Sequence, residues 1–315
     1  MYKAAKTLEI GLENAGRRLD NYLLSIFKNT PKSYVYRIIR SGEVRVNGGR
    51  KKAHTRLKLA DSVRIPPFRE STQTEPVISA QWRQSVMENI LYEDESVLVL
   101  DKPAGLSVHG GTGQSFGLID IVQKEFDDQI ELAHRIDKDT TGCLLLGKTP
   151  SAARELHRQF REGEVRKRYR TLLGGHLENT ETVVCARLTT QRRDIGEAKT
   201  RVDDHGKEAM SKFTAIDMLG AFSLACTYAD VSIETGRTHQ IRVHAAHIGH
   251  PVAGDRRYGD PALNDAMAKL GAPTLSLHSA CLEFTHPVSG ETVKVEAHVP
   301  QAMKQLVGSL SEMKR

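Results

Sequence analysis

The sequence lacks any apolar run long enough to cross a bilayer, and residues 1–11 lack the apolar core of a signal peptide. It is also poor in cysteine, and the thiols form no Cys-x-x-Cys pair, which argues against a zinc ribbon and against a disulfide scaffold. We therefore expect a cytoplasmic protein whose cysteines are mostly buried, reduced thiols. The four cysteines are Cys143, Cys185, Cys226 and Cys281.

The net charge of +6 is distributed unevenly along the 315 residues. Residues 1–70 hold 16 Lys and Arg against 6 Asp and Glu, whereas the rest of the chain has a slight excess of acid. A small basic segment on a nearly neutral body is typical of a polyanion-binding module joined to a larger domain. A merely solubilising surface would have the same composition, so the local pattern has to decide.

The basic segment predicts two helices and a small sheet. Apolar residues recur at helical spacing over 19–27, and Thr30-Pro31 offers an N-cap for a second helix over 32–40. Strands are expected at 44–46 and 63–65, the first followed by an Asn-Gly turn. Few aromatics lie among the cations, so a grip on structured RNA by shape is favoured over stacking on single strands. The residues that we expect to bind RNA are Lys32, Arg37, Arg40, Arg45, Arg50, Lys51 and Lys52.

The run RLDNYLLSIFKNTPKSYVYRIIRSGEVRVNGG resembles the S4 RNA-binding domain in its RLD start and in its tail. The resemblance implies an S4 domain over residues 1–66, with its core at 17–66. Residues 67–88 have little periodicity and mixed polarity, and we interpret them as a linker. A second domain is expected over 89–300, followed by a C-terminal tail at 301–315.

A glycine-rich stretch, VHGGTG at residues 108–113, follows the apolar run at 97–100. It matches neither G-x-x-x-x-G-K-[ST] nor G-x-G-x-x-G, the two fingerprints of phosphate binding in nucleotide sites. We expect a flexible loop at the mouth of a site and no nucleotide binding.

The most informative stretch is AHRIDKDTTG at residues 133–142, ahead of a strand at 143–147. Its Asp137 lies between cations on a polar loop. From the residues alone it could be a solvated turn residue, a structural ion-pair partner or a catalytic carboxylate, and the first two together are favoured.

Several stretches resemble the RluA-type pseudouridine synthases. HRIDKDTTG is similar to that family's H-R-L-D-x-x-T-S-G motif, and KRYRTLL at 167–173 is similar to its K-x-Y segment. TGRTHQIRVH at 235–244 is nearly the family's motif as it stands, and DRRYGD at 255–260 fits the usual continuation. The matches run from about residue 90 to 290.

This resemblance implies a role for each of four residues. Asp137 would be the catalytic carboxylate, and Arg242 would pair with it. Tyr169 would lie against the target base, and Arg135 would help to displace that base from its stack. We expect His134 to support the loop and Asp139 to be structural.

The family's reaction turns uridine into pseudouridine without gain or loss of atoms, so no cofactor is expected. The cluster His239, His244, His247 and His250 invites a metal interpretation, but it has no H-E-x-x-H and no carboxylate, and we expect no metal there. Structural or RNA-facing histidines fit better. Thr238 can N-cap a helix that runs to Ile248 and ends at Gly249.

The predicted fold class is α+β: a small S4 RNA-binding domain plus a catalytic domain with a large mixed, mainly antiparallel sheet and a central cleft. The predicted function is isomerisation of uridines in 23S ribosomal RNA by a monomer that does not bind membranes. Within the family the sequence most resembles the large-subunit synthase C type, which acts on several uridines. The alternatives are the synthase D type, with the same domain order, a non-catalytic S4-type assembly factor, and an RNA N-glycosidase, which would release free uracil.

Overall fold

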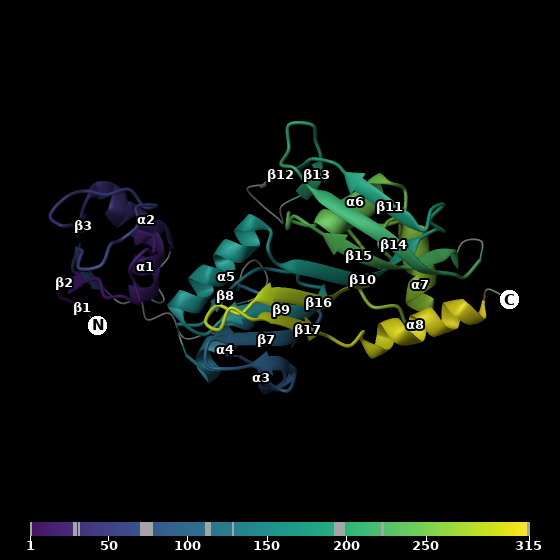
Figure 1. Ribbon diagram of the computed structural model, residues 1–315, viewed down its shortest axis with the longest axis horizontal. Helices are drawn as coiled ribbons and strands as arrows, with labels where there is room; N and C mark the ends of the chain where they lie inside the picture. Colours follow the sequence, from purple (N-terminus) through teal and green to yellow (C-terminus); the bar gives the residue numbers. More distant parts are fainter. Residues whose placement is uncertain are drawn as a thin grey trace. The chain divides into compact units, whose positions relative to one another are not determined.

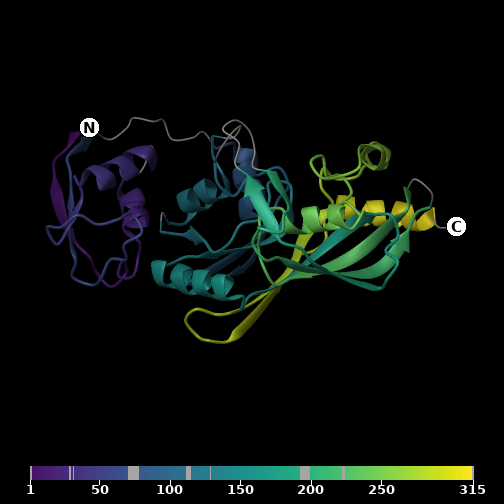
Figure 2. The same ribbon diagram turned by 90° about the horizontal axis from the view of Figure 1, so that it is seen from above.

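The computed structural model describes residues 2–27, 30, 32–69, 78–110, 115–127, 129–191, 199–221 and 224–313. The chain divides into two compact units, Met1–Val77 and Ile78–Arg315 (Figures 1 and 2). Within the described part of the chain, no helix is both long and apolar enough to cross a membrane.

The first unit has the two helices and the two strands that the sequence predicts, together with three strands, β1 (Tyr2–Lys3), β2 (Lys6–Glu9) and β5 (Phe68–Arg69), that were not predicted. Helices α1 (Leu19–Ile26) and α2 (Lys32–Ser41) pack on a three-stranded sheet in the order β2-β4-β3. The predicted turn is present: Asn47 and Gly48 have φ of 51° and 74°, as a type I′ turn requires. The predicted cap of α2 includes Pro31, which lies outside the described residues. The predicted strands are β3 (Arg45–Val46) and β4 (Ser62–Ile65).

The predicted linker differs from the structure at both ends. Phe68 is buried in the core of the first unit, on β5, which pairs with β1. At the other end Ala80–Met87 forms helix α3, whose cap Ser79 accepts a hydrogen bond from the backbone N–H of Trp82. Because Val86 is buried in the second unit, residues 78–88 belong to that unit.

The predicted C-terminal tail is also wrong. Gln301–Glu312 forms helix α8, and three of its side chains are buried against the sheet of the second unit. Their spacing is that of one helix face, so burial of this face holds the segment in place. These residues are Met303, Leu306 and Leu310.

The second unit is built on a ten-stranded sheet in the order β11-β14-β15-β10-β16-β9-β7-β6, with β17 also paired to β16 and β8 to β9. All its pairings are antiparallel except that of β9 with β16, so the predicted mixed, mainly antiparallel sheet is confirmed. A separate pair, β12 and β13, forms a two-stranded ribbon. The strands are β6 (Ile90–Glu93), β7 (Val97–Lys102), β8 (Glu131–Leu132), β9 (Thr141–Gly147), β10 (Arg166–Gly174), β11 (Glu181–Cys185), β12 (Leu188–Gln191), β13 (Lys199–Val202), β14 (Met210–Leu219), β15 (Cys226–Ile233), β16 (Leu277–Thr285) and β17 (Thr292–Glu296).

Helices cover both faces of this sheet. Near β7 and β9, α3 and α4 (Leu118–Glu125) pack on one face and α5 (Pro150–Glu162) packs on the other. Near β10 and β15, α6 (Gln240–His247) covers one face, and α7 (Pro261–Lys269) and α8 cover the other (Figure 1). Strand β7 shows the alternation: Val97 and Val99 contact one layer, and Leu98 and Leu100 contact the other.

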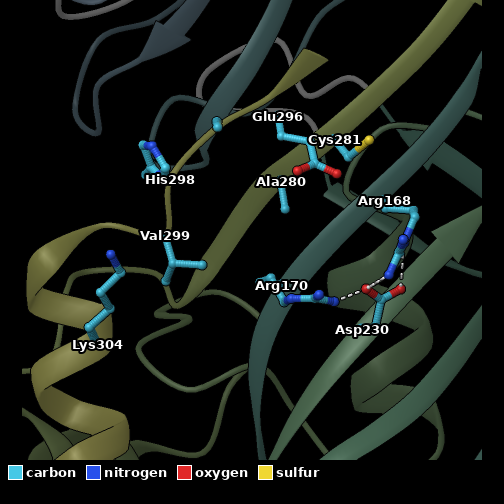
Figure 3. Close-up of a pocket in the computed structure, with 10 residues that line it drawn as sticks. Arg168, Arg170, Asp230, Ala280, Cys281, Glu296, His298, Val299 and Lys304 are labelled. Atoms are coloured by element: carbon cyan, nitrogen blue, oxygen red, sulfur yellow. Dashed lines mark hydrogen bonds and ion pairs between the residues drawn. The ribbon is translucent and has the colours of Figure 1, made fainter. Parts of the chain in front are cut away.

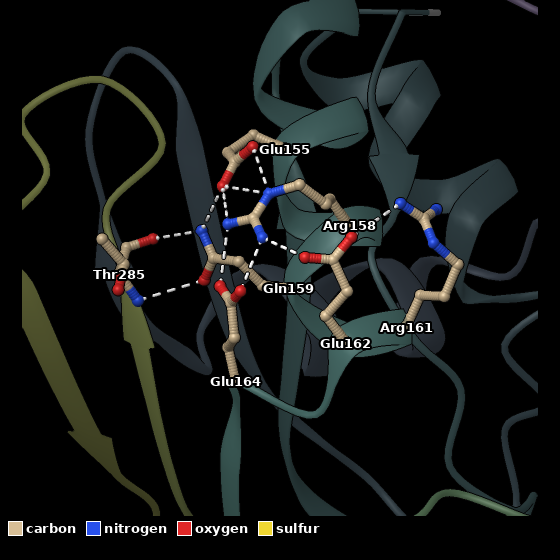
Figure 4. A network of polar contacts seen from close by, with 7 residues as sticks. All are labelled: Glu155, Arg158, Gln159, Arg161, Glu162, Glu164 and Thr285. Atoms are coloured by element: carbon tan, nitrogen blue, oxygen red, sulfur yellow. Dashed lines mark hydrogen bonds and ion pairs between the residues drawn. The ribbon is translucent and has the colours of Figure 1, made fainter.

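Helix α5 begins after Thr149, whose side chain accepts a hydrogen bond from the backbone N–H of Ala152. The buried side chain of Gln159 then exchanges two hydrogen bonds with the backbone of Thr285, which ties α5 to the end of β16 (Figure 4). On the outer face Arg158 pairs with three glutamates, an exposed network that contributes little to stability.

The parallel contact between β9 and β16 lies where the two halves of the sheet meet. Gly142 has φ of 101°, and a Cβ built there would lie 2.2 Å from the carbonyl oxygen of Ser279. Only glycine allows this close crossing. The segment just before it, residues 133–140, is therefore held at the junction.

Candidate active site

The loop at 133–140 joins β8 to β9 and carries Asp137. It is anchored from beneath by Lys102, whose fully buried Nζ donates to the carbonyl oxygens of Pro103 (2.7 Å), Leu106 (2.9 Å) and Lys138 (2.8 Å). Burial lowers the pKa of this lysine to about 7. No function was predicted for Lys102, although the residue stands at the end of a buried strand.

Asp137 and Arg242 form the expected pair. Arg242 Nη1 donates to Asp137 Oδ2 at 2.9 Å, and the second carboxylate oxygen, Oδ1, lies 3.8 Å from Nε2 of His239. The Asp137 side chain is 24% exposed, so it remains accessible while its partner is mostly covered.

Arg242 is itself fixed by a second carboxylate, that of Asp255. Its Nε and Nη2 donate to Asp255 Oδ2 and Oδ1 at 2.7 and 2.8 Å, and Asp255 also accepts the backbone N–H groups of Arg257 and Tyr258. Burial disfavours the charged forms of both groups, but the hydrogen bonds and opposite charges of the pair outweigh it. The pKa of Arg242 is therefore raised and that of Asp255 is lowered. Asp255 lies in the DRRYGD segment, to which the sequence assigned no function.

The start of α6 differs from the prediction. Thr238 is not the N-cap: the helix begins at Gln240, and the preceding residue, His239, has φ of 55°. Gln240 takes over the local hydrogen bonds, since its Oε1 accepts from Thr235 Oγ1 and from the N–H of Arg237, and its Nε2 donates to the carbonyl of Met210. This arrangement turns the His239 ring toward Asp137.

The four predicted site residues line one pocket of about 70 Å³. Tyr169 enters it from β10 and is buried, which raises the pKa of its phenol. Arg135 enters from the Asp137 loop and is exposed. The lining residues are Arg135, Ile136, Asp137, Thr140, Tyr169, Ile233, Gly236, Arg237, His239, Gln240, Ile241, Arg242 and Leu277.

Two of the other histidines singled out in the sequence, His134 and His244, have structural contacts. His134 Nε2 accepts from the N–H of Leu145 while its ring stacks on Phe160, and burial lowers its pKa to about 3. His244 is buried between Ser211 and the carbonyl of Ala186. Among the described residues, no three His, Cys, Asp or Glu side chains lie close enough to hold a metal ion.

A larger pocket, about 250 Å³, lies elsewhere in the second unit (Figure 3). It is lined by Arg168 and Arg170, which flank Tyr169 on β10 and point to the opposite face of the sheet. Both pair with Asp230. It has no carboxylate comparable to Asp137, accessible and held by a buried arginine, so its size does not make it the reaction site.

In the first unit, six of the seven predicted RNA-binding side chains are described. Arg40, Arg50, Lys51 and Lys52 are exposed and Arg45 is half-buried. Arg37 is also exposed, but its Nη1 donates to Glu43 at 3.1 Å. The side chain of Lys32 lies outside the described part of the structure. The glycine-rich loop was predicted at 108–113, of which residues 111–113 are likewise outside it.

Comparison with known proteins gives two family matches. The family described as RNA pseudouridylate synthase matches residues 96–247, and the S4 domain matches residues 17–63. The chain is 43% identical to "Ribosomal large subunit pseudouridine synthase C" of Pasteurella multocida, covering 99% of this chain and 96% of that protein. The protein of the same name from Escherichia coli (strain K12) is 40% identical, with 98% and 97% covered.

Solved structures agree in fold. "Human RNA Pseudouridylate Synthase Domain Containing 4" superposes with a TM-score of 0.58 at 22% identity, covering 72% of this chain and 95% of the human chain. At that identity the likeness concerns the fold alone. The full-length relatives are decisive: the chain belongs to the RNA pseudouridine synthase family and is an S4-containing isomerase of that family.

Proposed function

We propose that this protein converts uridines of large-subunit ribosomal RNA into pseudouridine, with Asp137 as the catalytic carboxylate. The observation that carries the proposal is the accessible Asp137 carboxylate, held by Arg242 in a pocket that also contains Tyr169 and Arg135. Full-length relatives named as large-subunit synthases support the choice of RNA.

The reaction needs a carboxylate that stays ionised away from bulk water. The bond between N1 of uracil and C1′ of ribose breaks, the base rotates, and a bond forms between C5 and C1′. The C5 proton is then lost and N1 takes up a proton, so atoms balance without a cofactor. Asp137 acts on the sugar or the base during these steps, and Arg242 holds its carboxylate in place.

The pocket residues handle the base. Arg135, exposed beside Asp137, occupies the space that the uracil leaves in its stack, and this lowers the cost of unstacking. Tyr169 gives the flipped base a flat surface. The exposed cations of the first unit, which include Lys51 and Lys52, hold RNA phosphates without reading sequence.

We extend the proposal to several uridines of 23S ribosomal RNA, as in the synthase C type, and to a monomeric, cytoplasmic enzyme. The test is to map pseudouridines in the ribosomal RNA of a strain that lacks the protein, with and without a plasmid-borne copy. We expect several large-subunit positions to lose the modification together and to regain it with the copy. An unchanged large-subunit map would contradict the proposed substrate, and free uracil released by the purified protein would indicate a glycosidase instead.

A further inference from the structure

His239 has a left-handed backbone conformation that the sequence around it does not predict. Its φ of 55° lies in the left-handed region, which residues other than glycine adopt only rarely and under strain. Such strain persists only where the surroundings impose it. Here it places the imidazole in the pocket, 14% exposed, beside Asp137.

The ring is held from behind by Tyr258. His239 Nδ1 lies 2.8 Å from the Tyr258 hydroxyl, and that hydroxyl oxygen accepts the backbone N–H of Thr200, on β13, at 3.1 Å. Since the oxygen accepts from Thr200, its own hydrogen is available to donate to Nδ1. A neutral ring then carries its hydrogen on Nε2.

Nε2 faces the carboxylate oxygen that Arg242 leaves open. It lies 3.8 Å from Asp137 Oδ1, whereas Arg242 binds Oδ2. An approach of less than about 1 Å brings the two atoms to hydrogen-bond distance. The neutral imidazole therefore presents an N–H donor to the carboxylate oxygen that Arg242 does not bind.

We infer that His239 is a positioning residue for Asp137, and that Thr200 and Tyr258 fix its tautomer so that Nε2–H orients the open carboxylate oxygen. The inference rests on the proposed function, because it takes Asp137 as the catalytic carboxylate. It assigns no reactivity to His239 itself. It also gives the β12–β13 ribbon a part in the site, through the Thr200 backbone.

The inference implies a pH dependence. The groups that face the ring are Asp137 from its loop, Arg242 from α6, and Asp255 and Tyr258 from the segment after α6. Burial lowers the pKa of His239, Asp137 opposes this, and Arg242 adds to it. The ring is therefore neutral at pH 7. On protonation Nδ1 gains a hydrogen, so the Tyr258 hydroxyl can no longer donate to it, and the imidazolium pairs through Nε2–H with Asp137 Oδ1. This charged pairing makes the carboxylate less available to the substrate, so turnover falls in acid.

The test uses two variants of the full-length enzyme, His239→Asn and Tyr258→Phe. Asparagine tolerates positive φ but cannot span Tyr258 and Asp137, and phenylalanine keeps the ring beneath Arg242 without the hydroxyl. The matched controls are His247→Asn, exposed at the end of α6, and Tyr92→Phe, whose hydroxyl contacts Asp94 instead. The readout is tritium release from C5-labelled uridines in a large-subunit rRNA transcript, as kcat and KM from pH 5 to 9.

We expect His239→Asn to lower kcat on the order of 10²-fold with KM changed less than about twofold, and to abolish the acid limb of the kcat profile. Tyr258→Phe removes a hydrogen bond that favours the neutral ring, so its acid limb should move to higher pH. Both controls should behave as the wild type.

Two results would overturn the inference: a wild-type kcat and acid limb in both variants, or a fall in kcat with the acid limb unmoved, which a merely structural role would give. Asp137→Asn is measured alongside. If it is active, the proposed function fails; if it is inactive while both variants keep the wild-type profile, only the role of His239 fails.

Discussion

Removing the charge of Asp255 should damage both stability and turnover, although this residue does not line the pocket. Asp255 Oδ1 accepts from Arg242 Nη2 and from two backbone N–H groups, and Oδ2 accepts from Arg242 Nε at 2.7 Å. In Asp255→Asn the remaining carbonyl can serve the three donors at Oδ1. The new NH₂ group then meets Arg242 Nε–H, donor against donor.

The magnitude follows from burial. The Asp255 side chain is fully buried, and breaking a buried, hydrogen-bonded charge pair costs about 3–5 kcal/mol. Arg242 keeps Asp137 as a counter-ion, so we expect the lower end, about 3 kcal/mol. For a unit of this size each kcal/mol corresponds to roughly 2–4 °C in Tm, so Tm should fall by about 6–12 °C. The displaced guanidinium should also lower kcat on the order of 10²-fold.

The stability difference should depend on pH. The folded-state pKa of Asp255 is lowered, so its contribution is fully present above the unfolded carboxyl pKa of about 4 and is lost as pH falls through the folded value. Wild type and variant should therefore converge in acid. Calorimetry between pH 3 and 7 measures this, with Asp265→Asn, exposed on α7, as the control that should stay within about 0.5 kcal/mol. Equal Tm and equal kcat for Asp255→Asn and wild type at pH 7 would refute the reasoning.

Three further predictions concern the loop, the junction and the basic face. Lys102→Met removes a hydrogen-bond donor from three carbonyl oxygens and should cost about 3 kcal/mol by chemical denaturation. Because the folded-state pKa of Lys102 is about 7, well below the unfolded value, wild type should gain stability over the variant as pH rises from 7 toward 10. A stability difference that does not change with pH would contradict this. Gly142→Ala puts a methyl against the Ser279 carbonyl and should lower Tm by several degrees and reduce kcat. The control Gly163→Ala, also at positive φ but with open space around it, should lower the free energy of unfolding by only about 1 kcal/mol. Equal losses of stability in the two variants would show that the junction is not tight. Replacing Lys51 and Lys52 together by Ala should reduce the slope of log affinity for rRNA against log salt concentration by about 1–2, with kcat retained. An unchanged slope in a filter-binding titration would show that the two lysines do not contact RNA phosphates.

Sequence patterns predicted the first unit well because its signals are local. The 3.6-residue spacing over 19–27 and the Asn-Gly turn each depend on neighbours in the chain, and both appear in the structure. The linker prediction failed for the opposite reason: α3 is held by Trp82 and Val86, which pack on a layer formed by α4 and β7, and eight residues give little periodicity alone.

The C-terminal helix could have been found. Met303, Leu306 and Leu310 recur at helical spacing, a signal that was available in the sequence. The start of α6 could not be read in the same way. Thr238 precedes an apolar pattern as a cap would, but the Gln240 amide takes the local hydrogen bonds, and nothing in the spacing indicates the left-handed turn at His239.

In the site, too, some residues could be predicted from sequence motifs and others depend on tertiary contacts. Resemblance to a family motif brought Asp137 and Arg242 together across the chain, and the structure places them in contact. Lys102 and Asp255 were missed because their importance depends on burial: one ammonium reaches three carbonyls, and one carboxylate holds the arginine from behind. Composition and spacing do not report such partners.

The central claim is that Asp137 carries the reaction, and the most direct measurement is tritium release from C5-labelled uridines of large-subunit rRNA by Asp137→Asn, with Asp139→Asn on the same loop as the control. We expect Asp137→Asn to lose at least about 10³-fold in rate with rRNA affinity within about twofold of wild type, and Asp139→Asn to keep most of its activity. Turnover by Asp137→Asn near the wild-type rate, or loss of activity in Asp139→Asn alone, would contradict the claim.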